Sequence, residues 1–549
     1  MEVTNHSLSQ ITAETLDKLS HDELLYVSNK LLKDLKEARD RLNQNPSNSS
    51  KPSGSMPPWE KGDVDKHGEA DTDAENHQDS EAQNISSTEK DQSGGSEETQ
   101  SANDNVGANA ENSANDKESP SSSETGNPER KKPGKQKGAQ GYGRVWNPEC
   151  TETEIHCHPM NCTVCGQELD PTKSIAYTQY KQVDIKLGHD ETSGLQVLIT
   201  PYTLYNNHCQ HCEHDNRYEP SSSVKIDPHI WGEVQLSQWR MIGPHLAAFI
   251  VHLKMEFRLP IRKIQGLLMY FGIPLSVGVI QQCYEEAGMA VSSLENELVA
   301  AVVSEALVHA DETAWLEKAK SLWLWIFMAS SVVYFCVGRR TKELVSNVLS
   351  ASFQGWLMSD GYGAYRHYEK RLRCWAHLLR KAQGLAESTD TQAVIFGKLV
   401  LNLMQVCMSA VYQWREEHPS LKEGTIELTT GLQPLLEAFK MACEKYGGNE
   451  VSHDKTKALA REFLNDWDTI FRVLAHPYLP LTNNEAERGL RPWVLLRKIC
   501  YGSKSARGTK VFALLASIMQ TCKKRSVCSM QFMAKAIASA RNGEAISLP

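Results

Sequence analysis

The sequence predicts a multidomain α/β protein with additional all-α regions, and three observations support this fold class. At 549 residues the chain is too long for a single hydrophobic core. Residues 304–387 alternate β-like apolar runs with a helical segment, whereas residues 388–475 are helical in pattern. Two Cys-x-x-Cys pairs indicate a small metal-binding region upstream of both. We therefore expect several domains around one mixed β-sheet.

Charge is unevenly distributed along the chain. The net charge is −9, but residues 46–127 alone contribute −13, which leaves +4 for the rest. No apolar run reaches the roughly 18–20 residues that span a bilayer, and the N-terminus lacks the pattern of a signal peptide. We therefore expect a cytoplasmic protein without membrane contact, whose 14 cysteines are thiols or metal ligands rather than disulfides.

The N-terminal region, residues 1–45, contains a leader helix predicted over residues 14–44. Its apolar side chains recur with the spacing of a short coiled-coil seam, at Leu24, Leu31, Leu35, Ala38 and Leu42. This pattern predicts self-association. A single amphipathic helix that packs on its own chain fits the pattern equally well.

Two segments of opposite charge follow. Residues 46–127 are rich in Ser, Asn, Gly, Glu and Asp, which predicts a disordered acidic linker. Residues 128–147 form a basic arm, for which contact with nucleic-acid phosphates is the favoured interpretation and a solvated linker the alternative. The basic residues of the arm that we expect to bind DNA are Arg130, Lys131, Lys132, Lys135 and Lys137.

The next region, residues 148–222, holds the paired cysteines, with two β-like stretches between the pairs. A hairpin between them would bring the two Cys-x-x-Cys knuckles together around a tetrahedral Zn²⁺. A site with four thiolates has no open position, so we expect a structural, zinc-ribbon-like role, although a nearby histidine can replace one cysteine. The expected ligands are Cys162, Cys165, Cys209 and Cys212.

Residues 223–303 are helical in pattern, with a break at Gly272-Ile273-Pro274 and a helix predicted to be capped by Ser276. This spacing is that of a helix-turn-helix, whose second helix would occupy a DNA major groove. Helical hairpins with Gly-Pro turns also occur in proteins that do not bind DNA, so that alternative stays open.

Acidic side chains follow two apolar runs in the sheet region. The run "LVHADETAWL" leads into Asp311 and Glu312, and we expect Asp311 at its strand end. A predicted hairpin and helix come next, and "GWLMSDGYGAY" then leads into Asp360. This is the order of elements in a ribonuclease-H-like sheet, where neighbouring strands each deliver one carboxylate to a shared metal site.

A third carboxylate is expected from the helix predicted in "LTNNEAERGLRPWVLLRK". Asn483 or Asn484 can cap this helix, and Glu485 and Glu487 both lie in its first turns. Glu487 also has the spacing of a capping box with Asn484, so its alternative role is to cap the helix. Three carboxylates suit two Mg²⁺ or Mn²⁺ ions, which prefer oxygen ligands and promote displacement at phosphorus.

The motifs "HADETAWL", "SDGYGAYR", "CWAHLLRK" and "NNEAERGLRPWVLLRK" together resemble the insertion-sequence 66 family of bacterial transposases. The resemblance implies an Asp-Asp-Glu transposase whose catalytic, metal-binding residues are Asp311, Asp360 and Glu487, with Glu485 as the competitor. Glu312 is then expected to be solvated or to support the other acids. The family continues with Asn where Ile499 stands here.

The resemblance also implies partners and an architecture. The partners are the terminal inverted repeats of the element, target DNA, further copies of the chain in the active complex, and small companion proteins. Residues 304–387 and 476–510 would form a ribonuclease-H-like core that a helical insertion, 388–475, interrupts, followed by a C-terminal helical region, 511–549. Four basic residues after Glu487 would hold the DNA backbone: Arg488, Arg491, Arg497 and Lys498.

Cys374 and His377 in "CWAH" are interpreted as a core cysteine beside a satisfied histidine, in preference to a metal or catalytic role. The expected activity is metal-dependent hydrolysis that frees a 3′-hydroxyl, followed by attack of that hydroxyl on target DNA. Two other functions stay open. One is a catalytically silent DNA-binding protein derived from a transposase, and the other is a ribonuclease-H-like nuclease without strand transfer.

Overall fold

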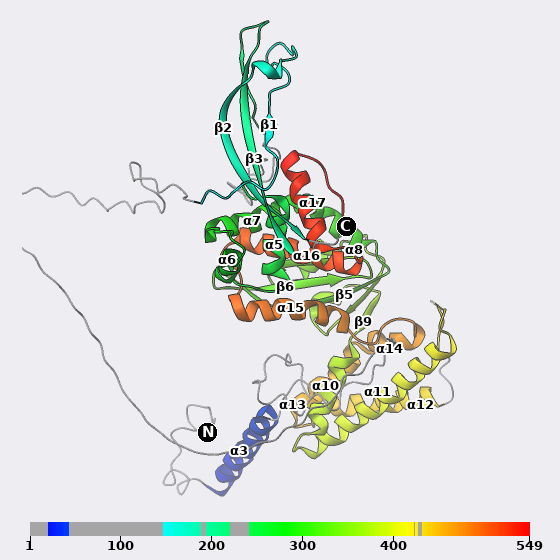
Figure 1. Ribbon diagram of the computed structural model, residues 1–549. Helices are drawn as coiled ribbons and strands as arrows, with labels where there is room; N and C mark the ends of the chain where they lie inside the picture. Colours follow the sequence, from blue (N-terminus) through cyan, green and yellow to red (C-terminus); the bar gives the residue numbers. More distant parts are fainter. Residues whose placement is uncertain (1–19, 43–145, 188–193, 220–240, 422, 427–430) are drawn as a thin grey trace, which may run out of the picture. The chain divides into compact units, whose positions relative to one another are not determined.

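The computed structural model describes residues 20–42, 146–187, 194–219, 241–421, 423–426 and 431–549 (Figure 1). The predicted acidic linker and the five basic residues of the predicted arm lie outside these ranges. The first described element is helix α3 (His21–Leu42). Ser20 and Glu23 form a reciprocal capping box in which the Glu23 carboxylate accepts from the Ser20 amide at 3.0 Å. This box explains a helix start at His21.

The cysteine region is a four-stranded sheet built around a long hairpin. Strands β2 (Ile175–Leu187) and β3 (Leu195–His208) pair antiparallel along most of their length. The short strands β1 (Ile155–Cys157) and β4 (Asp215–Arg217) pair with β3, parallel and antiparallel respectively. A 3-10 turn, η3 (Pro171–Lys173), precedes β2. The hairpin predicted between the two knuckles is therefore present.

A side chain of this hairpin caps the first helix of the next region. Asp184 of β2 accepts a hydrogen bond from the amide of Leu246 at 2.7 Å, in the first turn of α5 (Pro244–Met255). Gly243 precedes α5, and a Cβ there would lie 2.1 Å from the Asp184 side chain. Only glycine allows this close approach. The cap stabilises α5 through its unpaired N-terminal amides.

Helices α6 (Ile261–Tyr270) and α7 (Val277–Ala290) flank the predicted break, and Ser276 caps α7 by accepting from the Val279 amide at 3.3 Å. The second half of α7 is mostly buried, whereas Val277 and Gly278 at its start are exposed. A 3-10 turn, η4 (Ser292–Leu294), and α8 (Glu295–Val303) follow. The exposed residues at the start of α7 are available to a partner, and a helix-turn-helix role stays a prediction.

The central sheet has five strands in the order β7-β6-β5-β8-β9. Strand β5 (Leu307–Glu317), β6 (Lys320–Met328) and β7 (Val333–Gly338) are antiparallel neighbours, whereas β8 (Trp356–Ser359) and β9 (Arg371–Arg373) continue parallel to β5. Between β7 and β9 lie α9 (Lys342–Val348) and the turn η5 (Gly363–Tyr365). The sheet is thus mixed, as predicted.

Three C-terminal helices pack on this sheet and on the helices before it. They are α15 (Asn484–Cys500), α16 (Ala506–Lys524) and α17 (Ser529–Asn542). On α16, Ser517 accepts from the amide of Phe335 at 2.8 Å, and Thr521 accepts from the amide of Val333 at 3.1 Å. These hydroxyls satisfy the outer edge of β7, which would otherwise present unpaired amides.

The segment of the chain between β9 and α15 forms a second hydrophobic core. It is formed by α10 (Trp375–Ala386), α11 (Thr391–Glu417), α12 (Leu432–Gly447), α13 (Asp454–Asn465) and α14 (Trp467–Ala475). This core includes Trp375 and Leu378 of α10, which precede residue 388, where the helical insertion is predicted to begin. That boundary stays a prediction, and we refer to α10–α14 as the helical insertion. Among the described helices, α11 is long and apolar enough to cross a membrane. Core helices of soluble proteins meet the same criterion, and α11 buries Phe396 and Val400 in this core.

Candidate active site

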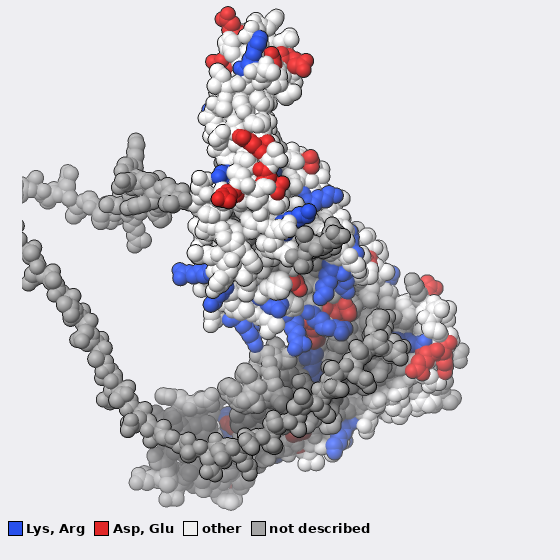
Figure 2. Space-filling view, viewed as in Figure 1, with Lys and Arg blue, Asp and Glu red and all other residues white. Residues whose placement is uncertain are grey.

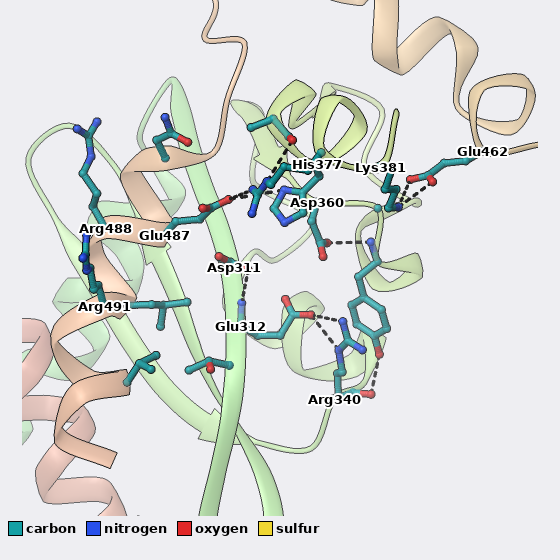
Figure 3. A pocket seen from close by; sticks show the side chains of 18 of the residues that line it. Asp311, Glu312, Arg340, Asp360, His377, Lys381, Glu462, Glu487, Arg488 and Arg491 are labelled. Atoms are coloured by element: carbon teal, nitrogen blue, oxygen red, sulfur yellow. Dashed lines mark hydrogen bonds and ion pairs between the residues drawn. The ribbon is translucent and has the colours of Figure 1, made fainter. Parts of the chain in front are cut away.

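A cavity of about 990 Å³ lies where the central sheet meets the helical insertion and α15 (Figure 3). Each of these parts contributes charged side chains to its wall. The acids that line it are Asp311 and Glu312 of β5, Asp360 directly after β8, Glu462 of α13 and Glu487 of α15. Four elements that are separated in the sequence therefore deliver carboxylates to one site.

Asp311 lies in the middle of β5, so the prediction that it ends its strand is wrong. The two aspartates still line the same cavity because β8 is short. Strand β8 pairs with β5 only at Leu307–His309 and ends at Ser359, while β5 continues to Glu317 in its pairing with β6. Asp360 therefore follows the end of β8 beside the part of β5 that has lost its parallel neighbour.

Asp311 is surrounded by negative charge and has little compensation. One Oδ1 hydrogen bond comes from the Glu312 amide at 2.8 Å, and Asp360 accepts from the Tyr362 amide at 2.8 Å. Within the described part of the chain, neither aspartate forms an ion pair. Burial, together with the charges of Glu312 and Asp360, raises the pKa of Asp311 well above its usual range. The site therefore favours a bound cation.

Glu312 is not solvated, in contrast to one of the two roles expected for it. Its side chain is 1 % exposed and pairs with Arg340 at 2.7 Å. The hydroxyl of Tyr365 donates to its other oxygen at 2.7 Å. Burial raises the pKa of Glu312, and the negative charge of Asp360 adds to this effect. Glu312 thus supports the site from a fixed position.

The structure separates the two candidate glutamates of α15. Glu487 points into the cavity, where its Oε1 lies 3.2 Å from Nη2 of Arg380 and 3.6 Å from Nδ1 of His377. Glu485 lies outside the cavity lining and pairs with Lys524 at 3.0 Å and with Arg488 at 3.3 Å. Only Glu487 therefore shares the cavity with Asp311 and Asp360.

The start of α15 is attached directly to β5, which fixes the position of Glu487. Asn483 occupies the N-cap position but makes no side-chain cap. Its buried amide instead donates to the carbonyl of Ala310 at 2.9 Å and contacts His309 at 3.1 Å. Gly489 lets α15 approach the sheet, since a Cβ there would lie 2.5 Å from Ile326 and Met328. The capping-box alternative for Glu487 is not observed.

His377 differs from the satisfied core histidine that was expected. It lines the cavity beside Glu487, and its Nδ1 is buried without a hydrogen-bond partner in the described part of the chain. Burial, together with the charge of Arg380, lowers the pKa of His377 to about 4, so the ring is neutral at pH 7. Cys374 is fully buried at the end of β9, as expected for a core cysteine.

Hard divalent ions fit the carboxylates of this cavity. Asp311, Asp360 and Glu487 supply oxygen ligands, which Mg²⁺ and Mn²⁺ prefer. The raised pKa of Asp311 and the absence of an ion pair to either aspartate, among the described residues, indicate a deficit of positive charge. These three residues can therefore hold such ions, and neither aspartate would have to give up an ion pair among the described residues.

The model of one protein family, described as "Transposase IS66 family", matches residues 240–511. The matched region includes Asp311, Asp360 and Glu487. The chain belongs to the IS66 transposase family. This confirms the resemblance inferred from the motifs.

Three relatives from Sinorhizobium fredii also match, and all are described as uncharacterized proteins. Protein y4qI is 24% identical over 330 residues, which cover 54% of this chain and 59% of y4qI. Protein y4jD is 24% identical over 307 residues, covering 51% of this chain and 58% of y4jD. The chain thus spans somewhat more than half the length of these two relatives.

Several cationic residues of the IS66 cavity were not predicted. The hairpin pattern gave no reason to select Arg340, which lies two residues after the end of a predicted strand. Arg366 ends the motif "SDGYGAYR", and Arg380 and Lys381 end the motif "CWAHLLRK", but no role was assigned to them from these motifs. Arg461 lies in none of the quoted motifs. These unpredicted residues are Arg340, Arg366, Arg380, Lys381 and Arg461.

Four basic residues after Glu487 were predicted to bind DNA. Three of them line the cavity, namely Arg488, Arg491 and Lys498. Figure 2 shows Lys and Arg side chains gathered over this part of the surface. Arg497 does not fit the prediction, because its guanidinium donates to the hydroxyl of Thr313 at 3.0 Å and to the carbonyl of Ala314. Arg497 thus joins α15 to β5, and its contact with DNA stays a prediction.

The predicted zinc ligands lie outside the matched region, and the structure brings them together. The Sγ atoms of Cys162, Cys165, Cys209 and Cys212 all lie within 4.8 Å of one another. The backbone amide of Cys165, more than any other group, lowers the pKa of Cys162 to about 5, which favours the thiolate. The cluster can therefore bind Zn²⁺ with four ligands.

Matching turns give both knuckles this geometry. The amide of Gly166 donates to the carbonyl of Cys162 at 2.9 Å, and the amide of Glu213 donates to that of Cys209 at 2.9 Å. Gly166 and Glu213 have positive φ angles of 74° and 58°. Asn216 joins the knuckles by accepting from the Thr163 amide at 2.8 Å. Each turn directs two sulfurs to the same side.

Proposed function

We propose that this protein is a DNA transposase that cleaves the ends of its insertion sequence and joins them to target DNA. The observation that carries the proposal is the shared cavity of Asp311, Asp360 and Glu487, with a surplus of acid at its centre and cationic side chains on its walls. Membership of the IS66 family supports the same conclusion and favours action on DNA in the bacterial cytoplasm.

We also propose a ribonuclease-H-like core. The support is the element order, in which three antiparallel strands, a helix and two parallel strands follow one another. In such a sheet, neighbouring strands each deliver one carboxylate, and β5 and β8 do this with Asp311 and Asp360. The helical insertion then separates this sheet from the helix that carries Glu487.

The residues of the cavity have distinct proposed roles. Asp311, Asp360 and Glu487 would hold Mg²⁺ or Mn²⁺, which when bound supplies activation of the attacking oxygen and stabilisation of the leaving oxygen. Arg340 fixes Glu312, and Arg380 fixes Glu487. The exposed side chains of Arg488 and Arg491 project from α15 away from the acids and are placed to hold phosphates of the DNA backbone (Figure 3).

The proposed reaction has two phosphoryl-transfer steps. In the first, a water oxygen bonds to phosphorus at the end of the element, the bond to the 3′-oxygen breaks, and that oxygen leaves as a 3′-hydroxyl. In the second, this hydroxyl bonds to a phosphorus of target DNA and displaces a target 3′-oxygen. Neither step requires a covalent bond between the protein and DNA.

The remaining regions are proposed to recognise DNA and partners. The α6–α7 pair and the predicted basic arm would bind the terminal repeats, and the four cysteines would hold a structural Zn²⁺. The exposed apolar side chains of α3, Leu25, Leu31 and Leu35, support association with further copies of the chain. Small companion proteins of the same element are expected partners.

Cleavage of duplex DNA that carries the ends of the element tests the proposal. We expect Asp311→Asn, Asp360→Asn and Glu487→Gln each to reduce 3′ nicking in Mg²⁺ by at least about 10³-fold, because each removes a ligand that acts in the transition state. Binding of the DNA ends should survive.

Glu485→Gln is the matched control, since this carboxylate lies on the same helix but outside the cavity. It should cleave at nearly the native rate. Loss of cleavage in Glu485→Gln together with retention in Glu487→Gln would reverse the assignment of the third acid. A native chain that binds ends in Mg²⁺ and never cuts, with or without the companion proteins, would instead identify a silent DNA-binding protein. Nicking without any joining would identify a nuclease.

A further inference from the structure

Three potential metal ligands of different chemistry meet at the edge of the cavity, where His377 and Glu487 line the wall and Cys374 is buried beside them. Cys374, at the N-cap position of α10, and His377, in its first turn, face Glu487 at the start of α15. Their ligand atoms all lie within 4.8 Å of one another. The set combines a thiol, an imidazole and a carboxylate, and so differs from the all-oxygen set of the two aspartates.

The backbone around Cys374 holds its sulfur in place. The amide of Cys374 donates to the carbonyl of Ser359 at 3.0 Å, and the amide of Asn483 donates to its Sγ at 3.1 Å. An N–H group directed at sulfur stabilises a thiolate, but burial has the larger effect and raises the pKa of Cys374 to about 11, so a metal ion would have to displace the thiol proton. The same Asn483 attaches α15 to β5, so Cys374 and Glu487 are positioned by one junction.

His377 is prepared to act as a ligand. Its Nδ1 has no hydrogen-bond partner in the described part of the chain and lies 3.6 Å from the carboxylate of Glu487. A buried nitrogen without a partner is costly for folding. Coordination of a metal ion would satisfy it, because a neutral imidazole nitrogen is a good ligand for zinc.

We propose that Cys374, His377 and Glu487 form a second metal site, which binds one borderline divalent ion of the Zn²⁺ type. Mixed sulfur, nitrogen and oxygen ligands suit Zn²⁺ and Co²⁺ and disfavour Mg²⁺. Three protein ligands leave one coordination position open toward the cavity. Where the proposed function holds, this site shares Glu487 with the catalytic carboxylates. Its occupation would then hold Glu487 beside His377 and inhibit cleavage.

Stoichiometric binding of Co²⁺ to the full-length, zinc-depleted chain tests this site. We expect two thiolate-bound ions per native chain, one in the four-cysteine cluster and one in the cavity, each counted by its thiolate-to-cobalt absorption band, which an ion held by carboxylates alone does not give. His377→Ala should bind one ion, while Cys162→Ser combined with Cys165→Ser should retain the cavity ion. Cys407→Ser, which replaces a buried cysteine of α11, is the matched control and should bind two.

A native chain that binds one ion, or a His377→Ala chain that binds two, would overturn the proposal. Because His377 lines the cavity and is partly exposed, its replacement tests the site even where Cys374→Ser fails to fold. The measurement does not depend on DNA cleavage. Failure of the proposed transposase activity would therefore leave the count of bound ions intact, and an incorrect ion count would leave the cleavage result intact.

Discussion

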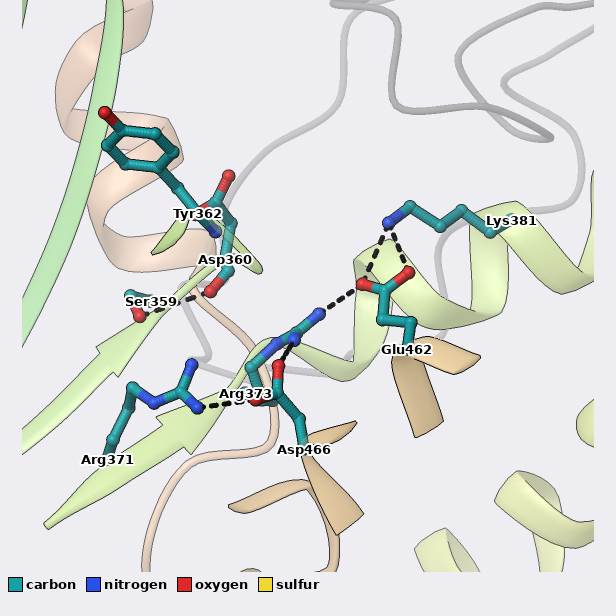
Figure 4. A network of polar contacts seen from close by, with 8 residues as sticks. All are labelled: Ser359, Asp360, Tyr362, Arg371, Arg373, Lys381, Glu462 and Asp466. Atoms are coloured by element: carbon teal, nitrogen blue, oxygen red, sulfur yellow. Dashed lines mark hydrogen bonds and ion pairs between the residues drawn. The ribbon is translucent and has the colours of Figure 1, made fainter. Parts of the chain in front are cut away.

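Two groups of charged side chains lie at neighbouring strands of the central sheet and are built in opposite ways. Around β9, Arg371 and Arg373 both pair with Asp466, Arg373 also pairs with Glu462, and Lys381 pairs with Glu462 at 2.8 Å (Figure 4). We call these five residues the β9 network. Beside the end of β8, Asp311 and Asp360 face one another without an ion pair among the described residues.

The pKa values of the acids express this difference. In the β9 network, burial by itself would raise the pKa of Asp466, but the hydrogen bond and charge of Arg371 lower it. The pKa of Glu462 is lowered in the same way by Lys381 and Arg373 against the effect of burial. In the other group, burial and negative neighbours raise the pKa of Asp311.

The comparison separates charges that are paired inside the protein from charges that are not. The β9 network joins the sheet to α13 and α14 and so fixes the wall of the cavity that Glu462 lines. Its charges are compensated inside the protein. Asp311 and Asp360 lack this compensation, which is typical of groups that await a cation or a substrate.

The largest effect is expected from breaking the β9 network. Arg373→Met should lower the free energy of unfolding by about 3–5 kcal/mol, because it leaves Asp466 and Glu462 buried with less positive charge. Chemical denaturation followed by tryptophan fluorescence measures this loss. Lys381→Met is the control, since this side chain is 39% exposed, and should cost at most about 1 kcal/mol. Equal losses in both variants would remove the distinction.

A smaller effect is expected from supplying the missing cation. Mg²⁺ at about 100 times its dissociation constant should raise the free energy of unfolding of the zinc-loaded native chain by about 2.7 kcal/mol. Asp311→Asn and Asp360→Asn should lose most of this gain, whereas Lys381→Met should keep it. The same denaturation, repeated with and without Mg²⁺, measures the difference. A gain that survives both aspartate substitutions would place the ion elsewhere.

The smallest effect is expected from removing one negative charge without adding metal. Asp311→Asn should raise the free energy of unfolding at pH 7 by about 0.5–2 kcal/mol, because it relieves repulsion at a functional site. The pKa of Asp311 is raised in the folded chain, so the native protein loses stability as pH rises from about 4, the unfolded value, through the folded pKa.

The pH dependence provides the check on this last prediction. Denaturation over that pH window should show a falling free energy of unfolding in the metal-free native chain and a flatter profile in Asp311→Asn. Asp466→Asn should behave in the opposite sense and destabilise the chain at pH 7, since its carboxylate is held by two arginines. A native profile that rises across the window would contradict the charge surplus at Asp311.

Much of the fold was predictable because its signals are local. The alternation of apolar runs gave the β6–β7 hairpin, and the Gly-Ile-Pro break with Ser276 gave the boundary between α6 and α7. Strand ends were less predictable. Asp311 was expected at a strand end because polar residues usually follow a buried run, but pairing with β6 extends β5 to Glu317.

The choice between Glu485 and Glu487 depended on a family motif, and the structure supplies a physical reason for it. Both glutamates lie in the first turn of α15, where either side chain is compatible with a helix N-terminus. Only the rotation of α15 on the sheet, set by Asn483 and Gly489, turns Glu487 into the cavity and Glu485 toward Lys524. The same rotation brings Arg497 onto β5.

By itself, the sequence determined the types of candidate ligand in this protein. The two Cys-x-x-Cys pairs, Asp311 and Asp360 are recognisable because short-range spacing and apolar patterning are written along the chain. Only the tertiary structure decided which charges remain uncompensated. The partners of Glu312, Asp466 and Glu487 come from residues 28 to 107 positions away, and such distances leave no local pattern.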